Sequence, residues 1–406
     1  MGHSLLSFVG AESLAHQDSE GEASGNRNAL AIILLMNFLL SLGFSTWQVL
    51  FSNFAVAEIG LGAAKIGLLQ SVREIPGLLG VGVGVLALLL AEMRIAGLAL
   101  ILTGVGLALT GSVGAFPAFI AASLVMSVGF HFFVSSNQSA AMMAVDERDA
   151  PRVLGSLSSV GAMGSLVGAG VVLVFLNLVG FRSLFYGVGA LLVLSGLVLA
   201  PWWGRRTIRR ERRRERLAIR KRYWLYYVLQ FLMGSRRHIF TTFAVFLLVK
   251  EHNVAAQTIT LLFVLNSLLG TLLYRQFGRI VARFGERQVL AVNFILLIPV
   301  FLGYAYISYL PMLCAIFVAD HLLFGFSIAI ESYLQKIAVS PEEITSNVAL
   351  GQTINHIAAV VVPLVGGIVW EQVGGRFTFL MGVAIAVACL VLVQWMRGRE
   401  VYPSRV

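Results

Sequence analysis

Long apolar segments, separated by short polar stretches, follow one another along most of the chain. A helix that crosses a bilayer needs about 20 consecutive, mostly apolar residues. Twelve segments meet this requirement: 29–54, 64–90, 95–113, 118–144, 154–179, 183–203, 224–250, 257–278, 288–308, 311–338, 345–370 and 376–396. Because backbone groups inside a bilayer must hydrogen-bond within their own segment, we predict an all-α polytopic membrane protein with twelve transmembrane helices.

The composition excludes the other broad classes. Of the 406 residues, 58% are hydrophobic and 12% are charged, and the mean hydropathy is +0.85. Soluble proteins are about 25% charged, and a soluble fold of this length could not bury so much apolar surface. The two cysteines, Cys314 and Cys389, lie in apolar segments and predict neither a disulfide nor a metal site. Residues 1–28 are polar and are predicted to form a disordered tail.

The basic residues are distributed unevenly among the connections. If the N-terminus is inside, cytoplasmic segments hold 23 of the 30 Lys and Arg residues, many of them in the linker 204–223. This asymmetry predicts that both termini are cytoplasmic and that the protein spans the inner (plasma) membrane many times. The linker is expected to anchor the topology and to contact anionic lipid headgroups. It lacks interleaved aromatic residues, so we expect no nucleic-acid partner.

The two halves of the membrane part resemble each other at an offset of about 195 residues. Gly180 and Arg182 match Gly374 and Arg376, and Gly155 matches Gly351. We therefore predict a six-helix bundle over 29–203, a second over 224–396 and a short C-terminal tail over 397–406. Six plus six helices in two parallel repeats form a known transporter architecture.

A cytoplasmic loop after the eighth segment carries a glycine followed by a cluster of charges and a second glycine. This loop closely resembles the loop motif of the major facilitator superfamily, and residues 351–376 are similar to its eleventh-helix region. The resemblance covers 29–396 and implies a secondary transporter that works by alternating access. It also implies that the loop stabilises one conformation. The motif residues are Gly278, Arg279, Arg283, Gly285 and Arg287.

The copy of this loop in the first half departs from the pattern. Leu89, Ala91 and Met93 stand where the motif has arginine, glycine and arginine, and Ala282 replaces the usual acidic residue in the second copy. The departure leaves open a second class of function, a scaffold or sensor of this fold that no longer transports.

The resemblance also implies that helices 1, 4, 7 and 10 line a central path. Polar residues three or four apart share one helix face, and these four segments carry such stripes, whereas segments 3, 6, 9 and 12 carry almost none. The stripes and their neighbours give the predicted substrate-binding residues of neutral or titratable type: Asn37, Gln48, His131, Gln138, Gln230 and His238.

Three arginines lie inside predicted helices, where each costs about 2.5–3.5 kcal/mol if it has no partner. Arginine offers a planar, permanently charged fork that suits carboxylate or phosphate, so Arg237 and Arg73 are predicted to bind an anionic group of the substrate. The alternative is internal pairing: Arg73 and Glu74 would bridge neighbouring helices, and the arginines at 236–237 would balance Asp320 or Glu331.

Carboxylates in a low-dielectric path can carry protons. Asp320, Glu331 and Glu74 are therefore the predicted proton-coupling residues. The chain has no phosphate-binding loop, which argues against direct coupling to ATP. It has no nucleophile–base pattern, so we expect no enzymatic activity, and no spacing demands a metal or another cofactor.

These observations together predict a monomeric secondary active transporter in the lipid bilayer. Its expected partners are protons and a small anionic or zwitterionic solute, moved by rocking of the two halves. The alternative within the same class is an exporter of amphipathic or cationic compounds or of metal ions, in which the arginines have a structural role only.

Overall fold

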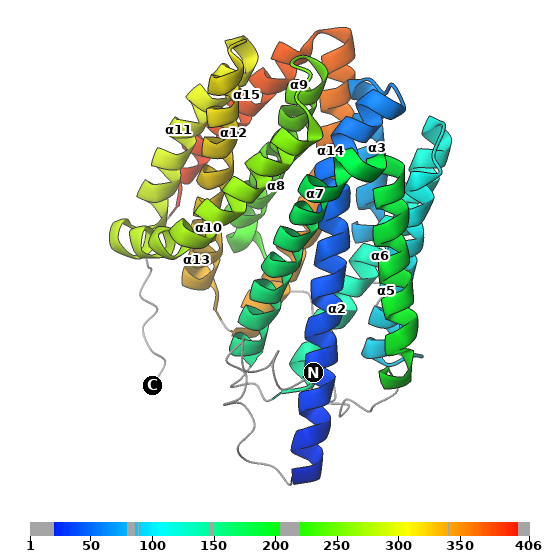
Figure 1. The fold of residues 1–406 in the computed structure, drawn as a ribbon. Coiled ribbons are helices and arrows are strands. Elements are labelled where there is room, and N and C mark those ends of the chain that lie inside the picture. The colour runs from blue at the N-terminus through cyan, green and yellow to red at the C-terminus, as the bar shows by residue number, and fades with distance from the viewer. Residues whose placement is uncertain are drawn as a thin grey trace, which may run out of the picture. The chain divides into compact units, whose positions relative to one another are not determined.

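The computed structural model describes residues 20–78, 86–87, 89–145, 150–203, 220–339 and 341–396. These ranges are almost entirely helical, and they contain no strand (Figure 1). Residues 1–19, most of the basic linker and the predicted tail 397–406 lie outside the described part. The first helix, α2 (Glu20–Asn53), begins inside the expected tail 1–28. Residues 20–28 are thus helical in the structure, and the disordered tail stays a prediction.

The chain forms two compact units. The first unit takes in the chain up to Phe54 and from Pro76 to Arg212, and the second takes in Ala55–Ile75 and the chain from Arg213 onward. Most of α3 (Ala63–Leu78) thus belongs to the second unit although it lies in the first half of the sequence. The predicted bundle boundaries, 29–203 and 224–396, stay a prediction.

The first unit is built around the long helix α7, which runs beside α2 and also packs against α5 (Figure 1). Gly164 and Gly168 on α7 face the backbone of α2, where a Cβ atom would meet carbonyl oxygens. Such glycines let membrane helices approach closely. The other helices that the structure describes in this unit are α5 (Glu92–Gly111), α6 (Phe116–Met143) and α7 (Ala150–Leu199), which a 3-10 turn over Ala200–Trp202 follows.

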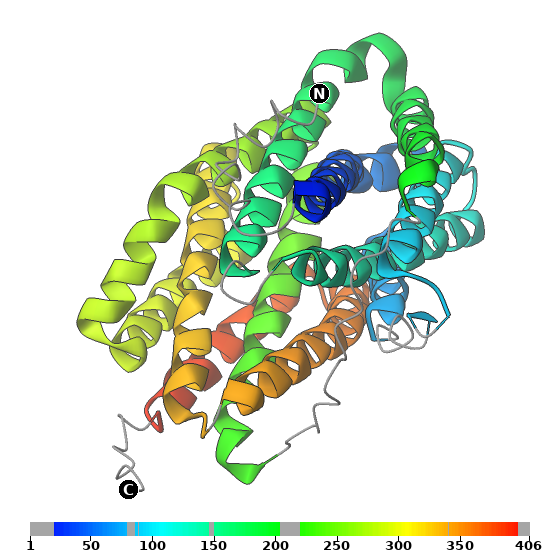
Figure 2. The ribbon, with the colours of Figure 1, turned by 90° about the horizontal axis from the view of Figure 1, so that it is seen from below.

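The second unit packs α8 against α14 and α15, and α11 against α15 (Figure 2). Two of its predicted helices are interrupted: 224–250 by a π-helical stretch and 311–338 by a 3-10 turn. Besides most of α3 and of the π-helix η2 (Phe54–Glu58), its described elements are η4 (Lys221–Tyr223), α8 (Trp224–Ile239), η5 (Phe240–Ala244), α9 (Val245–Lys250), α10 (Ala256–Phe284), α11 (Glu286–Tyr306), α12 (Leu310–Phe324), η6 (Gly325–Ser327), α13 (Ile328–Ile337), α14 (Pro341–Gln372) and α15 (Gly375–Val393).

Ten helical stretches in the described residues are long and apolar enough to cross a membrane. One of them, Arg152–Trp202, holds two predicted segments, because Gly180 interrupts the helical backbone with a φ of 77°. The predicted segment 64–90 is described as α3 and then only in part. The described helices are therefore consistent with the twelve that the apolar pattern predicts.

The predicted repeat is visible in the backbone. Gly60 and Asn253 both take positive φ, 72° and 50°, in the connection after the first helix of each half. In both places the next residue donates to the carbonyl six residues before it. Gly180 and Gly374, matched by sequence, also both take positive φ, 77° and 120°. The loop copies differ, because Gly285 has a φ of 81° whereas Ala91 has −66°.

Candidate functional site

Arg236 and Asp320 form a buried ion pair in the second unit. Nη2 of Arg236 donates to the Asp320 carboxylate and, at 2.7 Å, to the Asp320 backbone carbonyl. The two side chains are 2% and 0% exposed. The cation that balances Asp320 is thus Arg236 on α8, and this is one of the internal pairings that the sequence left open. Removing either partner would strand a charge in the core of the unit.

Glu331 on α13 lies in a different environment, although it belongs to the same predicted segment as Asp320. Nε2 of Gln230 donates to Glu331 at 2.5 Å, and the hydroxyl of Tyr226 lies 3.4 Å from the other carboxylate oxygen. Nε2 of Gln230 also donates to the Tyr226 hydroxyl at 3.0 Å. Among the described residues, the partners of Glu331 are therefore neutral. The fold brings together two predicted residues, Gln230 and Glu331, and adds Tyr226.

A third group of ionisable residues joins α3 to α14 within the second unit. Glu74 accepts from Nη2 of Arg73, and its other oxygen lies 3.1 Å from Nδ1 of His356. Nε of Arg73 donates to Gln70 at 2.8 Å. This is the helix-bridging alternative for Arg73 and Glu74, with His356 as the partner. The predicted residue His238 is half-buried on α8, and its Nε2 has no hydrogen-bond partner among the described residues.

Small residues bring α3 and α14 close enough for this bridge. A Cβ atom on Gly67 would collide with the carbonyl of Pro363, and one on Gly367 would lie 2.6 Å from the carbonyl of Ala63. At the end of α14, Glu371 accepts a hydrogen bond from the backbone N–H of Ala64 at 3.0 Å. A carboxylate at this position satisfies an N-terminal amide of α3 and complements the helix dipole.

Arg237 is the most exposed of the three intramembrane arginines. Its guanidinium lies 5.2 Å from the centroid of the Phe324 ring, and that of Arg236 lies 5.5 Å from the same centroid. The π-helical stretch Phe240–Ala244 follows directly, and such stretches occur frequently at functional sites. The anion contact at Arg237 stays a prediction, and Arg236 and Arg73 form ion pairs with Asp320 and Glu74.

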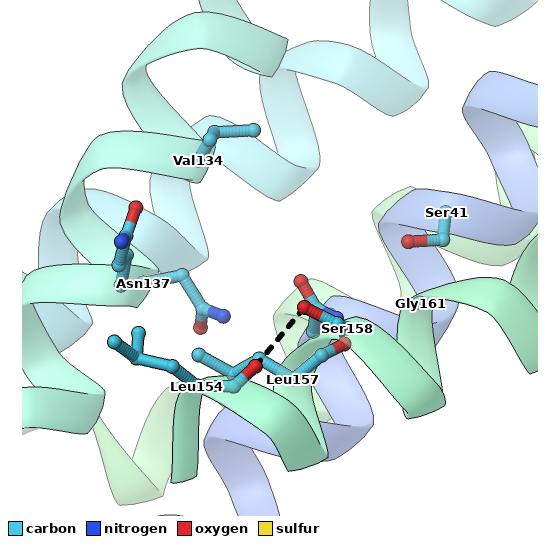
Figure 3. A pocket seen from close by; sticks show the side chains of 9 residues that line it. Ser41, Val134, Asn137, Leu154, Leu157, Ser158 and Gly161 are labelled. Carbon is cyan, nitrogen blue, oxygen red and sulfur yellow. Dashed lines mark hydrogen bonds between the residues drawn. The ribbon is translucent and has the colours of Figure 1, made fainter. Parts of the chain in front are cut away.

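The first unit contains a pocket of about 360 Å³ between α2, α6 and α7 (Figure 3). Two of its residues, Asn37 and Gln138, were predicted to bind substrate. Ser41 belongs to the predicted polar stripe of the first segment. Val134 and Asn137 were not predicted, and neither were the four lining residues of 154–179, because that segment was not expected to line the path; its serines and glycines were the available signal. The lining residues are Asn37, Ser41, Val134, Asn137, Gln138, Leu154, Leu157, Ser158 and Gly161.

Two further predicted substrate residues of the first unit do not line this pocket. His131 is buried on α6, where its ring makes an edge contact with Phe130 at 5.2 Å. Gln48 is exposed near the end of α2. Their roles as substrate contacts stay predictions.

Residues of the predicted conformational loop hydrogen-bond to the end of α15 and to α13 in the second unit. Arg287 donates to Gln394 of the last helix region at 2.9 Å. Glu286, which was not predicted, accepts from Ser332 and Lys336 of α13, at 2.6 Å each. The other two motif arginines contact residues close to them in the sequence. Arg279 donates to Gln276 at 3.0 Å, and the guanidinium of Arg283 lies 5.3 Å from the centroid of the Phe284 ring.

Comparison with known proteins agrees with this geometry. The model of the Major Facilitator Superfamily matches residues 33–330 and 226–406. A crystal structure of a point mutant of the nucleoside transporter NupG is similar with a TM-score of 0.75 and 16% identity, covering 91% of this chain and all of that one. A crystal structure of a bacterial homologue of the human lysosomal transporter Spinster, in an inward-facing and occupied conformation, is similar with a TM-score of 0.75 and 14% identity. The match covers 93% of this chain and 97% of that one. No curated protein matches the sequence. At these identities the solved structures show a shared fold alone.

Proposed function

Because this chain belongs to the major facilitator superfamily, a family of multi-pass membrane transporters, we propose that it is a proton-coupled secondary active transporter. It would move a small anionic or zwitterionic solute across the inner (plasma) membrane by alternating access, as a monomer with both termini in the cytoplasm. The observation that carries the proposal is the environment of Glu331, a carboxylate in a membrane-spanning segment whose partners among the described residues are neutral.

The three predicted proton carriers differ in what protonation would leave behind. A proton on Asp320 would leave Arg236 buried and charged without its counterion, and breaking such a pair by mutation costs about 3–5 kcal/mol. Glu74 is shared between Arg73 and His356, so its protonation would unbalance a larger group of charges. Both carboxylates therefore suit a structural role better than repeated loss and gain of a proton.

Glu331 can change its charge without stranding another. Gln230 carries an amide N–H and a carbonyl, and Tyr226 carries a hydroxyl, so each can either donate or accept. Both can hydrogen-bond to the carboxylate and, after a local rotation, to the protonated carboxyl. A membrane carboxylate with partners of this kind is suited to bind a proton in one conformation and to release it in another.

The solute side of the proposal depends on Arg237. Arg236 and Arg73 are engaged with Asp320 and Glu74, whereas Arg237 is exposed and contacts the Phe324 ring. A guanidinium that stacks on a ring presents its N–H groups at the edge of its plane, and this fork matches the geometry of a carboxylate or phosphate. Arg237 is therefore the residue through which we expect an anionic group to bind.

Transport in reconstituted liposomes tests this function. Purified protein should accumulate a solute found by a thermal-shift screen when a pH gradient is imposed, and Glu331→Gln should abolish accumulation while the solute still binds. Glu371→Gln serves as the matched control, because it makes the same change at an exposed helix end. No solute flux under any gradient would favour the scaffold or sensor, and accumulation by Glu331→Gln equal to the wild type would contradict the role of Glu331.

The internal pairing of Arg236 and Arg73 also agrees with the second candidate, an exporter of amphipathic or cationic compounds or of metal ions. That candidate requires no anion contact at Arg237. Binding of a cationic solute that is unchanged in Arg237→Gln would favour it.

A further inference from the structure

Glu331 and two side chains of α8 form a closed ring of hydrogen bonds. Nε2 of Gln230 donates to Oε1 of Glu331 at 2.5 Å and to the hydroxyl oxygen of Tyr226 at 3.0 Å, so both amide N–H groups of Gln230 are used. The Tyr226 hydroxyl donates in turn to Oε2 of Glu331 at 3.4 Å. A charged carboxylate can only accept, so the direction of every hydrogen bond in the ring is fixed while Glu331 is ionised.

Binding of a proton by Glu331 requires one group of this ring to reverse its role. Gln230 can keep both of its donations, because Oε1 of Glu331 still accepts. A proton on Oε2 would point at the Tyr226 oxygen, which can accept it once the hydroxyl turns its own hydrogen away. The position of the Tyr226 hydroxyl therefore decides how well each protonation state of Glu331 is accommodated.

Gly351 on α14 fixes where this hydroxyl lies. A Cβ atom at Gly351 would lie 2.5 Å from the Tyr226 hydroxyl oxygen and 3.4 Å from Nε2 of Gln230. Tyr226 is 0% exposed, so its ring cannot swing aside without repacking its neighbours. Gly155, which matches Gly351 in the sequence repeat, has open space where its Cβ atom would be, with nothing within 4 Å. The close approach is thus particular to the second half of the chain.

From this geometry we infer that Tyr226 and Gly351 are positioning residues for the proton site. The glycine seats the hydroxyl, and the hydroxyl sets the pH at which Glu331 exchanges its proton. Removing the hydroxyl should favour the protonated form, because a hydrogen bond to a charged acceptor is stronger than one to a neutral group. The inference rests on the proposed role of Glu331 as the proton carrier and adds two residues to that site.

Other ionisable side chains at the same end of the helices that pack against α13 have contacts of their own. Among the described residues, Tyr226 is thus the titratable side chain hydrogen-bonded to Glu331. The other contacts are Tyr227 of α8 with Asn347, Glu343 of α14 with Arg220 and Tyr223, Glu286 and Arg287 of α11 with Lys336 and Gln394, and Arg279 and Arg283 of α10 with Gln276 and the Phe284 ring.

The test follows the protonation of Glu331 itself, by infrared difference spectroscopy of the detergent-purified full chain at stepwise pH. The carboxyl C=O band that is missing in Glu331→Gln reports this residue. Tyr226→Phe, which removes only the hydroxyl, should move the midpoint of the band upward by about half a pH unit or more, the difference between a charged and a neutral hydrogen bond. Gly351→Ala should also shift the midpoint, because the displaced hydroxyl changes its distance to Oε2, whereas Gly155→Ala should leave the midpoint unchanged.

Combining the two changes separates positioning from packing. In Tyr226→Phe the atom with which the new Cβ atom collides is gone, so adding Gly351→Ala should leave the midpoint where Tyr226→Phe alone puts it. A midpoint that Tyr226→Phe does not move would overturn the inference, and so would a shift by Gly351→Ala that persists in full without the hydroxyl. Where Gly351→Ala does not yield folded protein, the midpoint of Tyr226→Phe decides.

Failure of this inference differs from failure of the proposed function. Proton flux in liposomes that is lost in Glu331→Gln, together with equal midpoints in the tyrosine and glycine variants, would contradict the inference alone. Shifted midpoints in a protein without flux would support the positioning of Glu331 and contradict transport.

Discussion

Asp320 and Glu331 belong to one predicted membrane segment, 311–338, but they lie in two different surroundings. Asp320 in α12 is fully buried against the guanidinium of Arg236. Glu331 in α13, beyond the 3-10 turn, is half-buried against an amide and a hydroxyl. We therefore expect the partner of each carboxylate, more than its presence in the membrane, to decide its role. We expect a carboxylate that faces a fixed cation to stay charged. A carboxylate that faces neutral groups able to donate or accept can gain and lose a proton.

The largest expected effect comes from breaking the buried ion pair of Arg236 and Asp320. Arg236→Gln or Asp320→Asn alone should each lower the free energy of unfolding by about 3–5 kcal/mol, because each strands a buried charge. The double variant should recover most of this loss. Unfolding in detergent, followed by a thiol-reactive dye on the buried Cys389, would measure it. If the two losses simply add in the double variant, the pair is not the coupled unit described above.

A smaller effect is expected where the two loop copies differ in their backbone. Gly285 has a φ of 81° and a ψ of 156°, a region that essentially only glycine adopts, so Gly285→Ala should cost about 1–3 kcal/mol from strain. It should also reduce flux, because Glu286 next to it holds Lys336 and Ser332. Ala91→Gly, at an ordinary φ, is the matched change in the first copy and should cost less than half as much. Equal losses of stability and flux would remove the asymmetry between the copies.

Arg237 offers a third environment, in which an exposed cation rests on an aromatic ring. Arg237→Gln should lower stability by only about 0.5–1 kcal/mol, the range of an exposed cation–π contact, but should weaken binding of an anionic solute about tenfold or more. Arg237→Lys should fail to restore affinity if the fork binds two oxygens. Calorimetric titration of the three proteins measures this. Full affinity in Arg237→Gln would end the case for an anionic substrate.

The smallest effect is expected at Glu371, where the partner is a backbone amide. Glu371→Gln should cost only about 0.3–1 kcal/mol at low ionic strength, because the side chain is exposed and the amide can still accept from Ala64. The loss should disappear in high salt, which screens the helix dipole. A loss above 2 kcal/mol that persists in high salt would show that this carboxylate contributes to stability as the buried Arg236–Asp320 ion pair does.

The sequence predicted the fold well because membrane helices depend on the length of apolar runs and on little else. It also placed the positive-φ glycines Gly180 and Gly374 in matching positions of the two halves. The partners of the charges were harder to predict. Successive residues of a helix diverge by about 100°, so the assignment of Asp320 to Arg236 rather than to Arg237 depends on helix rotation, which the sequence pattern left open.

The pocket shows a second limit of prediction from the sequence. Asn37 and Gln138 were predicted from polar stripes on two helices, but Asn137 and Ser158 were missed. Asn137 directly precedes the chosen stripe residue, and Ser158 belongs to a helix that the stripes did not include. Ser158 lies at the pocket because α2 and α7 approach closely at Gly164 and Gly168, and Asn137 because α6 packs beside both helices. Such an approach is a property of tertiary packing, which a single helix face cannot reveal.

Proton movement during solute flux tests the contrast between Asp320 and Glu331 most directly. The protein is reconstituted with a pH-sensitive dye inside the liposomes, and the proton flux that accompanies a solute gradient is recorded. Glu331→Gln should abolish this proton flux, whereas the double variant Arg236→Gln with Asp320→Asn should retain it at a rate within a few-fold of the wild type. Proton flux that survives in Glu331→Gln and disappears in the double variant would contradict the assignment and move the proton to Asp320.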